Sequence, residues 1–505
     1  MNANMDMNGF LQSPIDLHIE QFYTFRTIMD IYNELGCGLD EILLDSSKED
    51  SPFSHYSIIG KNPFLTVKYE QGVIYTKSYP SCDFKAAKET DIFSYLNLLL
   101  DQYSLENPTL LPFIGGGIGY FGYDLSKELE AIRPQAKSLV DIPDCYFVFY
   151  DNYLILDLTM NMLTVTGLGL LNSSESSVSA IKDTLHSHDS TNDTHQMSIS
   201  DSPISSIYKK TLNDDVPTLS TDVPLQSIDF HSAFTKETYM NSVQSMKNYI
   251  EDGHIYIANM THTYTSQFSL SPKTTYEHLR AINPAPFSAF MPLDGFDILS
   301  SSPERFIEII NNKVQTRPIK GTMPRGSNEE EDSINKNILS NSEKDKSELL
   351  MIVDLERNDL SKVCIPGSVK VTELFEIETY ATVFHLVSTI EGILKPENTN
   401  VDCMKATFPG GSITGAPKFR AMEIIEELEP TRRNIYTGSI GYLGFDGNAD
   451  FNIVIRTILL KNNKSYIGVG GGITWESDPA MEFQETLDKA NALFLTLNEV
   501  YKSNQ

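Results

Sequence analysis

The sequence predicts a mixed α/β protein, large enough for one globular unit or for two to three domains. Of its 505 residues, 40% are hydrophobic and 21% are charged. The alternating segment Tyr146-Phe147-Val148-Phe149-Tyr150 and the apolar segment 92–100 show that strands and helices are mixed in the first third of the chain. A closing helix is expected from about Pro479 to Tyr501.

Three parts of the chain differ in composition. Residues 1–171 carry the mixed strand and helix pattern. Residues 172–224 are rich in Ser, Thr and Asp and poor in large apolar side chains, which predicts a flexible insertion or linker. Residues 225–505 resume the dense apolar pattern, and the chain shows no internal repeat.

Charge and cysteine content exclude several classes of protein. The net charge of −29 argues against binding a nucleic acid, and no segment has the roughly 20 apolar residues of a membrane helix. Residues 1–16 lack the pattern of a signal peptide, and the five cysteines lie far apart, so we expect a cytoplasmic protein. An anionic substrate would need local positive charge or a metal ion.

The glycine-dense run from Gly115 to Asp124 predicts packing and not nucleotide binding. A nucleotide site would need G-x-G-x-x-G at the opening of a helix, with an acidic residue later. The aromatic side chains between these glycines instead indicate that strand backbones lie close together.

The closing helix carries a candidate binding site. Ser477-Asp478-Pro479 is a helix start signal, and Glu482, Glu485 and Lys489 then share one helical face. The run from Gly468 to Ile473 just before it would let backbone N–H groups reach an anion. The alternative is a solvated Glu–Lys pair on the surface.

A second acidic helix is expected over residues 342–359. Glu348 precedes its apolar stripe, where it could point a carboxylate into a cleft. Carboxylates from two helices suit Mg²⁺, a hard ion that keeps several waters. The alternative is that Glu348 is a solvated helix residue.

Two polar side chains stand in apolar runs. Arg456 ends the strand-like segment 451–455, so it should have a carboxylate partner, either a ligand or an internal Asp or Glu. His385, within residues 382–388, is either a satisfied core histidine or a catalytic one.

Lys320 lies in a segment from Pro318 to Gly326 that is punctuated by turn residues, which predicts a strand-to-loop connection. An amine held there can act as a nucleophile when nearby positive charge or burial favours its neutral form. Glu304 precedes it by sixteen residues, so a hairpin could bring both to one pocket, where a glutamate could donate a proton. The alternatives are a surface lysine and a Glu304–Arg305 charge pair.

These stretches together resemble the chorismate-utilising enzymes, which include anthranilate synthase component I, aminodeoxychorismate synthase component I, and the isochorismate and salicylate synthases. The resemblance runs in order from Tyr239 to Leu497 and is weaker in the N-terminal part. The matching motifs are Ser302 to Phe306, Pro318 to Gly326, Met351 to Asp359, Phe408 to Lys418, Tyr436 to Tyr442, Ile455 to Thr457 and Gly470 to Lys489.

The resemblance implies an anthranilate synthase component I-like fold, with two packed, largely antiparallel sheets flanked by helices. Residues 1–171 would be its N-terminal region and residues 225–505 its chorismate-binding catalytic region. The implied substrate is chorismate, a dicarboxylate, and the implied ion is Mg²⁺. By motif position, the metal ligands are Glu348 and Glu485, the chorismate-binding residues are Tyr436, Arg456, Lys489 and the backbone of Gly470 and Gly472, and the residues lining the reacting ring are Thr322 and His385.

Two positions distinguish the branches of this family. Anthranilate synthases typically have P-I-A-G-T, whereas aminodeoxychorismate synthases typically have P-I-K-G-T, as here with Lys320. The isochorismate branch activates water with a lysine at the position of Ile257, and isoleucine cannot do so. Glutamine is usual at Ile257 in the amine-adding branches and arginine near Thr263, so this chain departs from the family at one pocket edge.

The implied reaction joins chorismate and ammonia to give 4-amino-4-deoxychorismate, toward 4-aminobenzoate and folate. Lys320 would form a covalent adduct and Glu304 would protonate the departing hydroxyl. The chain shows no G-x-C-x-G glutaminase motif, so a separate glutamine amidotransferase subunit is the expected ammonia donor. The alternatives are anthranilate synthase component I and a catalytically silent interaction or regulatory homologue.

Overall fold

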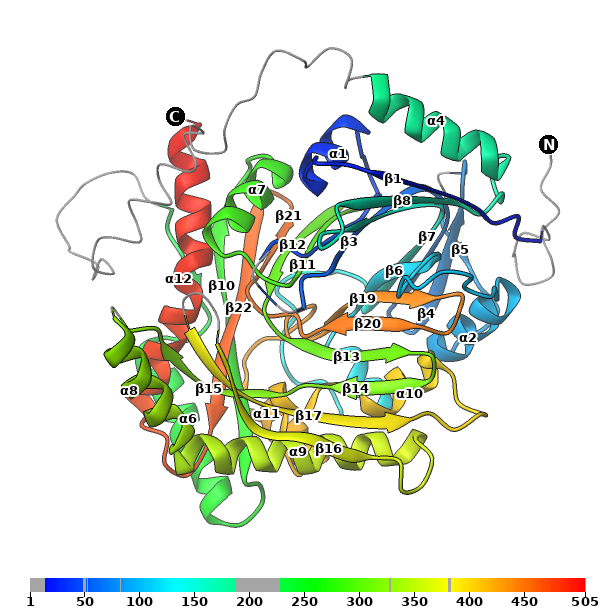
Figure 1. The fold of residues 1–505 in the computed structure, drawn as a ribbon. Coiled ribbons are helices and arrows are strands. Elements are labelled where there is room, and N and C mark those ends of the chain that lie inside the picture. Colours follow the sequence, from blue (N-terminus) through cyan, green and yellow to red (C-terminus); the bar gives the residue numbers. More distant parts are fainter. Residues whose placement is uncertain are drawn as a thin grey trace.

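A computed structural model describes residues 14–48, 51, 53–81, 83–187, 228–326, 328–379 and 383–504 (Figure 1). Its strands are β1 (His18–Tyr23), β2 (Leu43–Asp45), β3 (Tyr56–Glu70), β4 (Val73–Ser78), β5 (Lys85–Ala86), β6 (Gly116–Phe121), β7 (Cys145–Asp157), β8 (Met162–Gly167), β9 (His231–Ser232), β10 (Ile257–Gln267), β11 (Phe287–Leu293), β12 (Phe296–Ser302), β13 (Arg305–Ile310), β14 (Lys313–Thr316), β15 (Ile319–Pro324), β16 (Lys370–Thr379), β17 (Val383–Ile393), β18 (Gly415–Ala416), β19 (Ser439–Gly444), β20 (Ala449–Asn452), β21 (Thr457–Lys461) and β22 (Lys464–Ile473). Its helices are α1 (Ile28–Glu34), α2 (Ile92–Gln102), α3 (Leu125–Leu129), α4 (Ser174–Ser187), α6 (Lys236–Glu251), α7 (Pro272–Ile282), α8 (Glu329–Ser340), α9 (Glu343–Val363), α10 (Asn400–Thr407), α11 (Lys418–Leu428) and α12 (Pro479–Ser503), with a short 3₁₀ turn η3 (Gly411–Ile413).

The strands form two layers that are joined through β3 and β7. One layer runs β10–β22–β21–β12–β11–β2 and continues into the first half of β3. The other starts from the first half of β7 and runs β6–β19–β20–β13–β14–β17, with β15 and β16 beside β17. All of these ladders are antiparallel, and helices flank them, so the predicted fold class is confirmed.

The crossing between layers is built into two long strands. The β3–β7 pairing shifts register between Pro63 and Leu65, so β3 has a bulge at Phe64 that bends this strand. Before the bend β3 pairs with β2, and after it β3 pairs with β4. The N-terminal and C-terminal parts of the chain therefore share one hydrogen-bonded framework.

Aromatic side chains fill the space between the layers. Tyr120 and Tyr146 of the second layer meet Phe296 of the first, with ring centroids 6.4 and 6.0 Å apart. A β-carbon at Gly119 would lie 2.1 Å from the carbonyl oxygen of Tyr146, and one at Gly116 would lie 2.0 Å from that of Leu443. The prediction that the glycine run packs between strands is thus confirmed.

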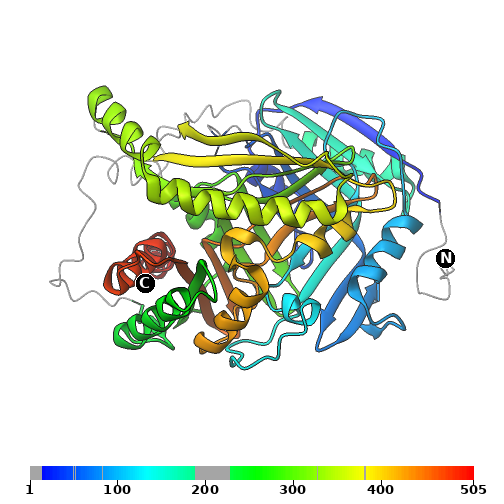
Figure 2. The same ribbon diagram turned by 90° about the horizontal axis from the view of Figure 1, so that it is seen from below.

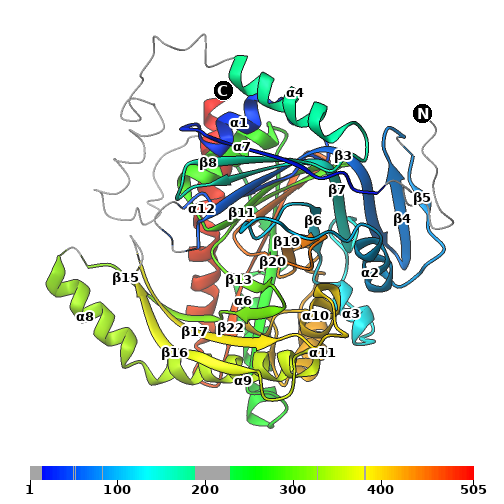
Figure 3. The same ribbon diagram turned by 45° about the vertical axis from the view of Figure 1, so that its right-hand side comes forward.

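Helix α4 corrects the expectation for residues 172–224. Its first part was expected to be flexible, but Ser174–Ser187 is helical and lies across β1 and β8 (Figure 3). The reason is an apolar face of Val178, Ile181 and Leu185, all buried against the sheet. Residues 188–224 of that segment lie outside the described residues.

The two helices that were expected to carry acidic residues are both present. Helix α9 begins after the capping residue Ser342 and runs beneath β16 and β17 (Figure 2). Helix α12 packs on β22, α6 and α7. Within the described residues, no helix combines the length and apolar character needed to span a membrane.

Candidate functional site

The glycine run before the closing helix forms the end of strand β22. It pairs on one side with β10, through Thr261 opposite Gly470 and Asn259 opposite Gly472. On the other side, β21 pairs only with residues 464–467. Within the described chain, one edge of the run from Gly468 onward therefore has no strand neighbour, which leaves backbone groups available to a ligand.

Side chains from three other segments of the chain gather on this glycine run. A β-carbon at Gly468 would lie 2.1 Å from the Tyr436 ring. A β-carbon at Gly471 would lie 3.3 Å from Oε2 of Glu482, 3.5 Å from Oε1 of Glu485 and 3.5 Å from Nζ of Lys489. A β-carbon at Gly472 would lie 3.8 Å from Nζ of Lys320. The glycines of the run form the floor of the candidate site because they have no side chains to fill the space.

We expect Gly468→Ala to destabilise the protein by about 1–3 kcal/mol, because the new methyl group displaces the buried Tyr436 ring. Gly472→Ala is the matched control. Its β-carbon would come no closer than 3.4 Å, to Ile257, so its stability should stay within about 0.5 kcal/mol of wild type. Urea denaturation measures both, and equal stabilities would show that the Tyr436 ring is not held by this contact.

The face of α12 that was predicted to bind a ligand lies on this floor. Asp478 caps the helix by accepting from the backbone N–H groups of Ala480 and Met481, at 2.9 and 3.0 Å. Lys489 donates to the carbonyl oxygen of Gly470 at 2.8 Å and pairs with Glu485 at 2.6 Å. The Glu–Lys pair is real, but it lies over the floor of the site and not on a remote surface.

Acidic groups are concentrated at this place. Burial raises the pKa of Glu482, and the nearby charge of Glu485 adds to the effect. Burial also disfavours the charged form of Glu485, but Lys489 outweighs it and the pKa of Glu485 is lowered. The sequence placed Glu482 on the candidate binding face with Glu485 and Lys489, but the predicted metal ligands were Glu348 and Glu485 only.

Glu348 approaches the same charges from α9. Its side chain is mostly buried, with 14% exposed, and Lys344 lies 3.9 Å away. Burial raises its pKa, Lys320 and Lys344 oppose the rise, and Asp345 and Glu482 add to it. Because Glu348 responds to both Lys320 and Glu482, the structure brings α9 and α12 to one site.

The donor atoms available here fit Mg²⁺. They are carboxylate oxygens, the ligands that this hard cation prefers. In the described ranges, no group of three or more His, Cys, Asp or Glu side chains is arranged to hold a metal ion by itself. Waters and substrate oxygens would have to complete the coordination shell, as is usual for Mg²⁺.

Lys320 and Glu304 meet at a third residue, Ser412. Ser412 Oγ donates to Oε1 of Glu304 at 2.7 Å, and Lys320 Nζ donates to the carbonyl oxygen of Ser412 at 3.3 Å. A hairpin, β13–β14, lies between them, but Glu304 comes just before β13 and Lys320 lies on the next strand, β15, which pairs with β17 as β14 does. Burial raises the pKa of Glu304, while Ser412, Lys320 and Lys489 oppose the rise. A buried carboxyl of this kind can carry a transferable proton.

Two details of this segment differ from expectation. Lys320 lies within strand β15 and not on a strand-to-loop connection, because the turn residue Gly321, with φ of +71°, is absorbed as an irregularity in the β15–β17 pairing. Arg305 does not pair with Glu304. It binds Asp450 at 2.8 Å and Glu308 at 3.0 Å.

Arg456 occupies a turn and not a strand end. Strand β20 stops at Asn452, and Arg456 has φ of +53° just before β21. No Asp or Glu side chain in the described parts of the chain forms an ion pair with it. Burial lowers its pKa, and Tyr436 and Glu485 oppose this. The guanidinium therefore lies within electrostatic reach of Tyr436 and Glu485 and keeps its charge available to an anion.

Thr322 and His385 form a pair on β15 and β17. Thr322 Oγ1 and His385 Nδ1 lie 2.9 Å apart, and the two residues are opposite each other in the ladder. Burial lowers the pKa of His385 to about 4, and Lys48 contributes. His385 is thus neutral at pH 7. It is adjacent on β17 to Leu386, the residue that lies opposite Lys320 in the β15–β17 ladder.

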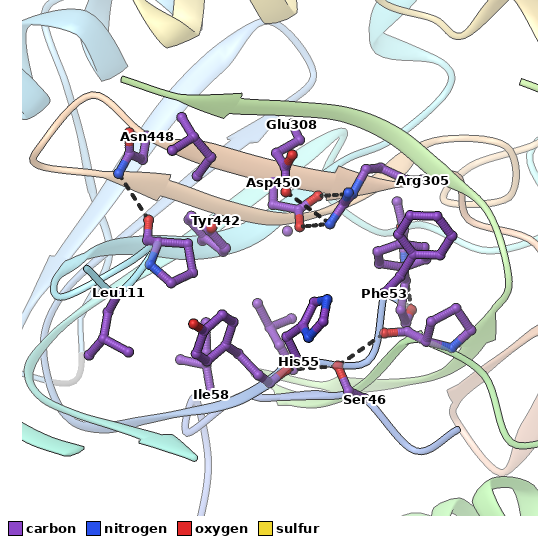
Figure 4. A pocket seen from close by; sticks show the side chains of 18 of the residues that line it. Ser46, Phe53, His55, Ile58, Leu111, Arg305, Glu308, Tyr442, Asn448 and Asp450 are labelled. Carbon is purple, nitrogen blue, oxygen red and sulfur yellow. Dashed lines mark hydrogen bonds and ion pairs between the residues drawn. The ribbon is translucent and has the colours of Figure 1, made fainter. Parts of the chain in front are cut away.

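A cavity of about 310 Å³ lies between the two layers, away from the glycine run (Figure 4). Ser46 and His55 from the N-terminal region and Arg305 and Asp450 from the C-terminal region line it. Arg305 lines this cavity, whereas the carboxyl group of its sequence neighbour Glu304 accepts from Ser412. No sequence pattern predicted this one, because its walls come from segments some 250 residues apart.

The chain is similar to a known family of enzymes. A model of the chorismate binding enzyme family matches residues 42–495. The chain is 38% identical to aminodeoxychorismate synthase component 1 of Escherichia coli, covering 91% of this chain and 93% of that one. It is 35% identical to anthranilate synthase component 1 of Acetivibrio thermocellus, covering 96% and 95%.

Solved structures show the same architecture. Anthranilate synthase component I from Streptococcus pneumoniae superposes with a TM-score of 0.71 at 30% identity, over 88% of this chain and 93% of that one. The menaquinone-specific isochorismate synthase of Escherichia coli superposes with a TM-score of 0.64 over 96% and 95%. Its identity is only 14%, so that match bears on the fold alone.

Proposed function

The chain belongs to the family of chorismate binding enzymes, and on that premise we propose that it converts chorismate and ammonia to 4-amino-4-deoxychorismate. Overall identity does not separate this activity from anthranilate synthesis, since relatives of both kinds lie at 38% and 35%. The observation that carries the proposal is Lys320, whose amine lies over the glycine floor beside Glu304 and Ser412. Alanine, the residue typical of anthranilate synthases here, would leave that position without a nucleophile.

The site can neutralise a dianionic substrate in an acidic protein. Arg456 and Lys489 supply fixed positive charge, and Tyr436 and the backbone of Gly470 and Gly472 shape the floor on which the ring rests. Glu348 and Glu485 would hold Mg²⁺, which supplies further positive charge for a substrate carboxylate. These groups reverse, locally, the potential set by a net charge of −29.

Lys320 Nζ forms a bond to ring C2 of chorismate while the C4–O bond breaks and the ring double bonds shift. Glu304 gives its proton to the departing oxygen, so that water leaves, and its carboxylate takes up the proton that the Lys320 amine loses. Ammonia then bonds to C4, the double bonds shift back and the C2–Nζ bond breaks, while a proton passes from the new ammonium group to the departing Lys320 amine. The net reaction is chorismate plus ammonia to aminodeoxychorismate plus water. Thr322 and neutral His385 would line the ring.

A glutamine amidotransferase subunit would deliver the ammonia. The two relatives compared are named as component 1 of their synthases, which fits a chain that works with a second component. The described cysteines Cys37, Cys145, Cys364 and Cys403 form no disulfide, which fits a cytoplasmic enzyme.

Product analysis by mass spectrometry tests the proposal. The purified chain with chorismate, Mg²⁺ and ammonium salt should yield 4-amino-4-deoxychorismate without any second subunit. Anthranilate and pyruvate would instead identify an anthranilate synthase. Chorismate left intact under these conditions would favour a catalytically silent homologue.

A further inference from the structure

Ser412 occupies a loop that buried cations hold in place. Lys418 donates to the carbonyl oxygens of Thr407 and Pro409 at 2.9 and 2.8 Å, and it pairs with Asp359. Arg433 donates to the carbonyl oxygen of Ile413 at 2.9 Å. Both sides of η3 are therefore fixed, and Ser412 between them cannot move far without breaking buried hydrogen bonds.

Ser412 contacts both Glu304, which gives up a proton in the proposed reaction, and Lys320, which forms the covalent bond. Its hydroxyl donates to Oε1 of Glu304, and its carbonyl oxygen accepts from Nζ of Lys320. The backbone of Glu304 is fixed as well, since its carbonyl oxygen accepts from the Ile453 N–H at 2.9 Å. The only remaining freedom of the Glu304 carboxyl is rotation of its side chain, and the Ser412 hydroxyl restrains that rotation.

We propose that Ser412 is a positioning residue that fixes which oxygen of Glu304 delivers the proton. A carboxylic acid has one hydroxyl and one carbonyl oxygen, and the donor from Ser412 occupies Oε1. The proton therefore resides on Oε2, which is left to face the leaving oxygen of the substrate. This inference rests on the proposed function, because it assigns Glu304 as the acid.

The groups around Glu304 determine in which direction its pKa should move when the Ser412 hydroxyl is removed. Lys320 of β15, Lys489 of α12 and the Ser412 hydroxyl lower the pKa of Glu304, against burial that raises it. Glu356 of α9 and Tyr436 also face it. Loss of the hydroxyl should raise the pKa of Glu304 further. Since the protonated acid is the active form, the decline of the rate at high pH should move to higher pH.

The test measures chorismate consumption against pH, at a fixed concentration of free ammonia. Ser412→Ala should lower kcat by about 10- to 100-fold, which is part of the total effect of general acid catalysis. It should also move the decline of the rate at high pH to a higher pH. Ser412→Thr keeps the hydroxyl, so its kcat should be within about threefold of wild type and its decline should return to the wild-type pH. Ser333→Ala, on the exposed face of α8, is the matched control. A decline at the wild-type pH in Ser412→Ala would overturn the proposal.

A double-mutant cycle with Glu304→Gln separates positioning from loop damage. If Ser412 acts through Glu304, Ser412→Ala should cost less than about threefold in the Glu304→Gln background. The same loss in both backgrounds would refute the inference. The assay follows chorismate consumption and does not depend on which product forms. An anthranilate product would therefore refute the proposed function, but the interaction between the substitutions at positions 304 and 412 could still be measured.

Discussion

Lys320→Ala is expected to lower the rate of aminodeoxychorismate formation by at least about 10³-fold, because the covalent route then has no nucleophile. Lys320→Arg should be equally inactive, since a guanidinium keeps the charge but does not act as a nucleophile near neutral pH. The two variants together separate the loss of a nucleophile from the loss of a positive charge beside Glu304 and Glu348.

The adduct itself can be observed. With chorismate, Mg²⁺ and no ammonia, the intact mass of the wild-type chain should rise by the mass of chorismate less one water, and addition of ammonium should discharge it. Lys336→Ala, an exposed lysine of α8, should behave as wild type. Aminodeoxychorismate formed by Lys320→Ala at the wild-type rate would show that this residue is not a covalent catalyst.

The sequence predicted those parts of the site that depend on local signals. The cap at Asp478 and the i, i+3, i+7 spacing of Glu482, Glu485 and Lys489 are properties of one helix, and they appear as expected. The glycine run Gly468–Ile473 also had a local signature. The side chains that contact these glycines could not be predicted from a local signature, because Tyr436 and Lys320 come from other parts of the chain.

Long-range packing explains what the sequence could not show. Ser412 joins Glu304 and Lys320 only because η3 folds against the β13–β15 region, from about a hundred residues away. Arg456 was expected to end a strand. The pairing of β20 with β13 instead ends at Asn452, and Arg456 has a left-handed backbone conformation in the connection to β21. Such geometry depends on which strands pair and not on local composition.

Chelation of Mg²⁺ is expected to abolish chorismate turnover, and added Mg²⁺ should restore it. Glu485→Gln and Glu348→Gln should each raise the Mg²⁺ concentration needed for half-maximal rate by at least about tenfold, because each removes a charged oxygen ligand. Glu343→Gln is the matched control, since that side chain lies on the same helix as Glu348 and is 89% exposed. Full activity in the presence of chelator would show that the carboxylates serve another purpose.

The pH dependence of Mg²⁺ binding follows from the same carboxylates. A ligand must be ionised to bind the cation, and binding releases protons from groups that are protonated beforehand. Of the two proposed ligands, Glu348 has a pKa that burial raises, whereas Lys489 lowers that of Glu485, so the charged form of Glu348 is lost at a higher pH than for a solvated glutamate. Affinity for Mg²⁺, measured by calorimetry with chorismate present, should therefore fall as pH is lowered and Glu348 takes up a proton. In Glu348→Gln this fall should be smaller, because one of the groups that must lose a proton has been removed, whereas in Glu343→Gln it should be unchanged.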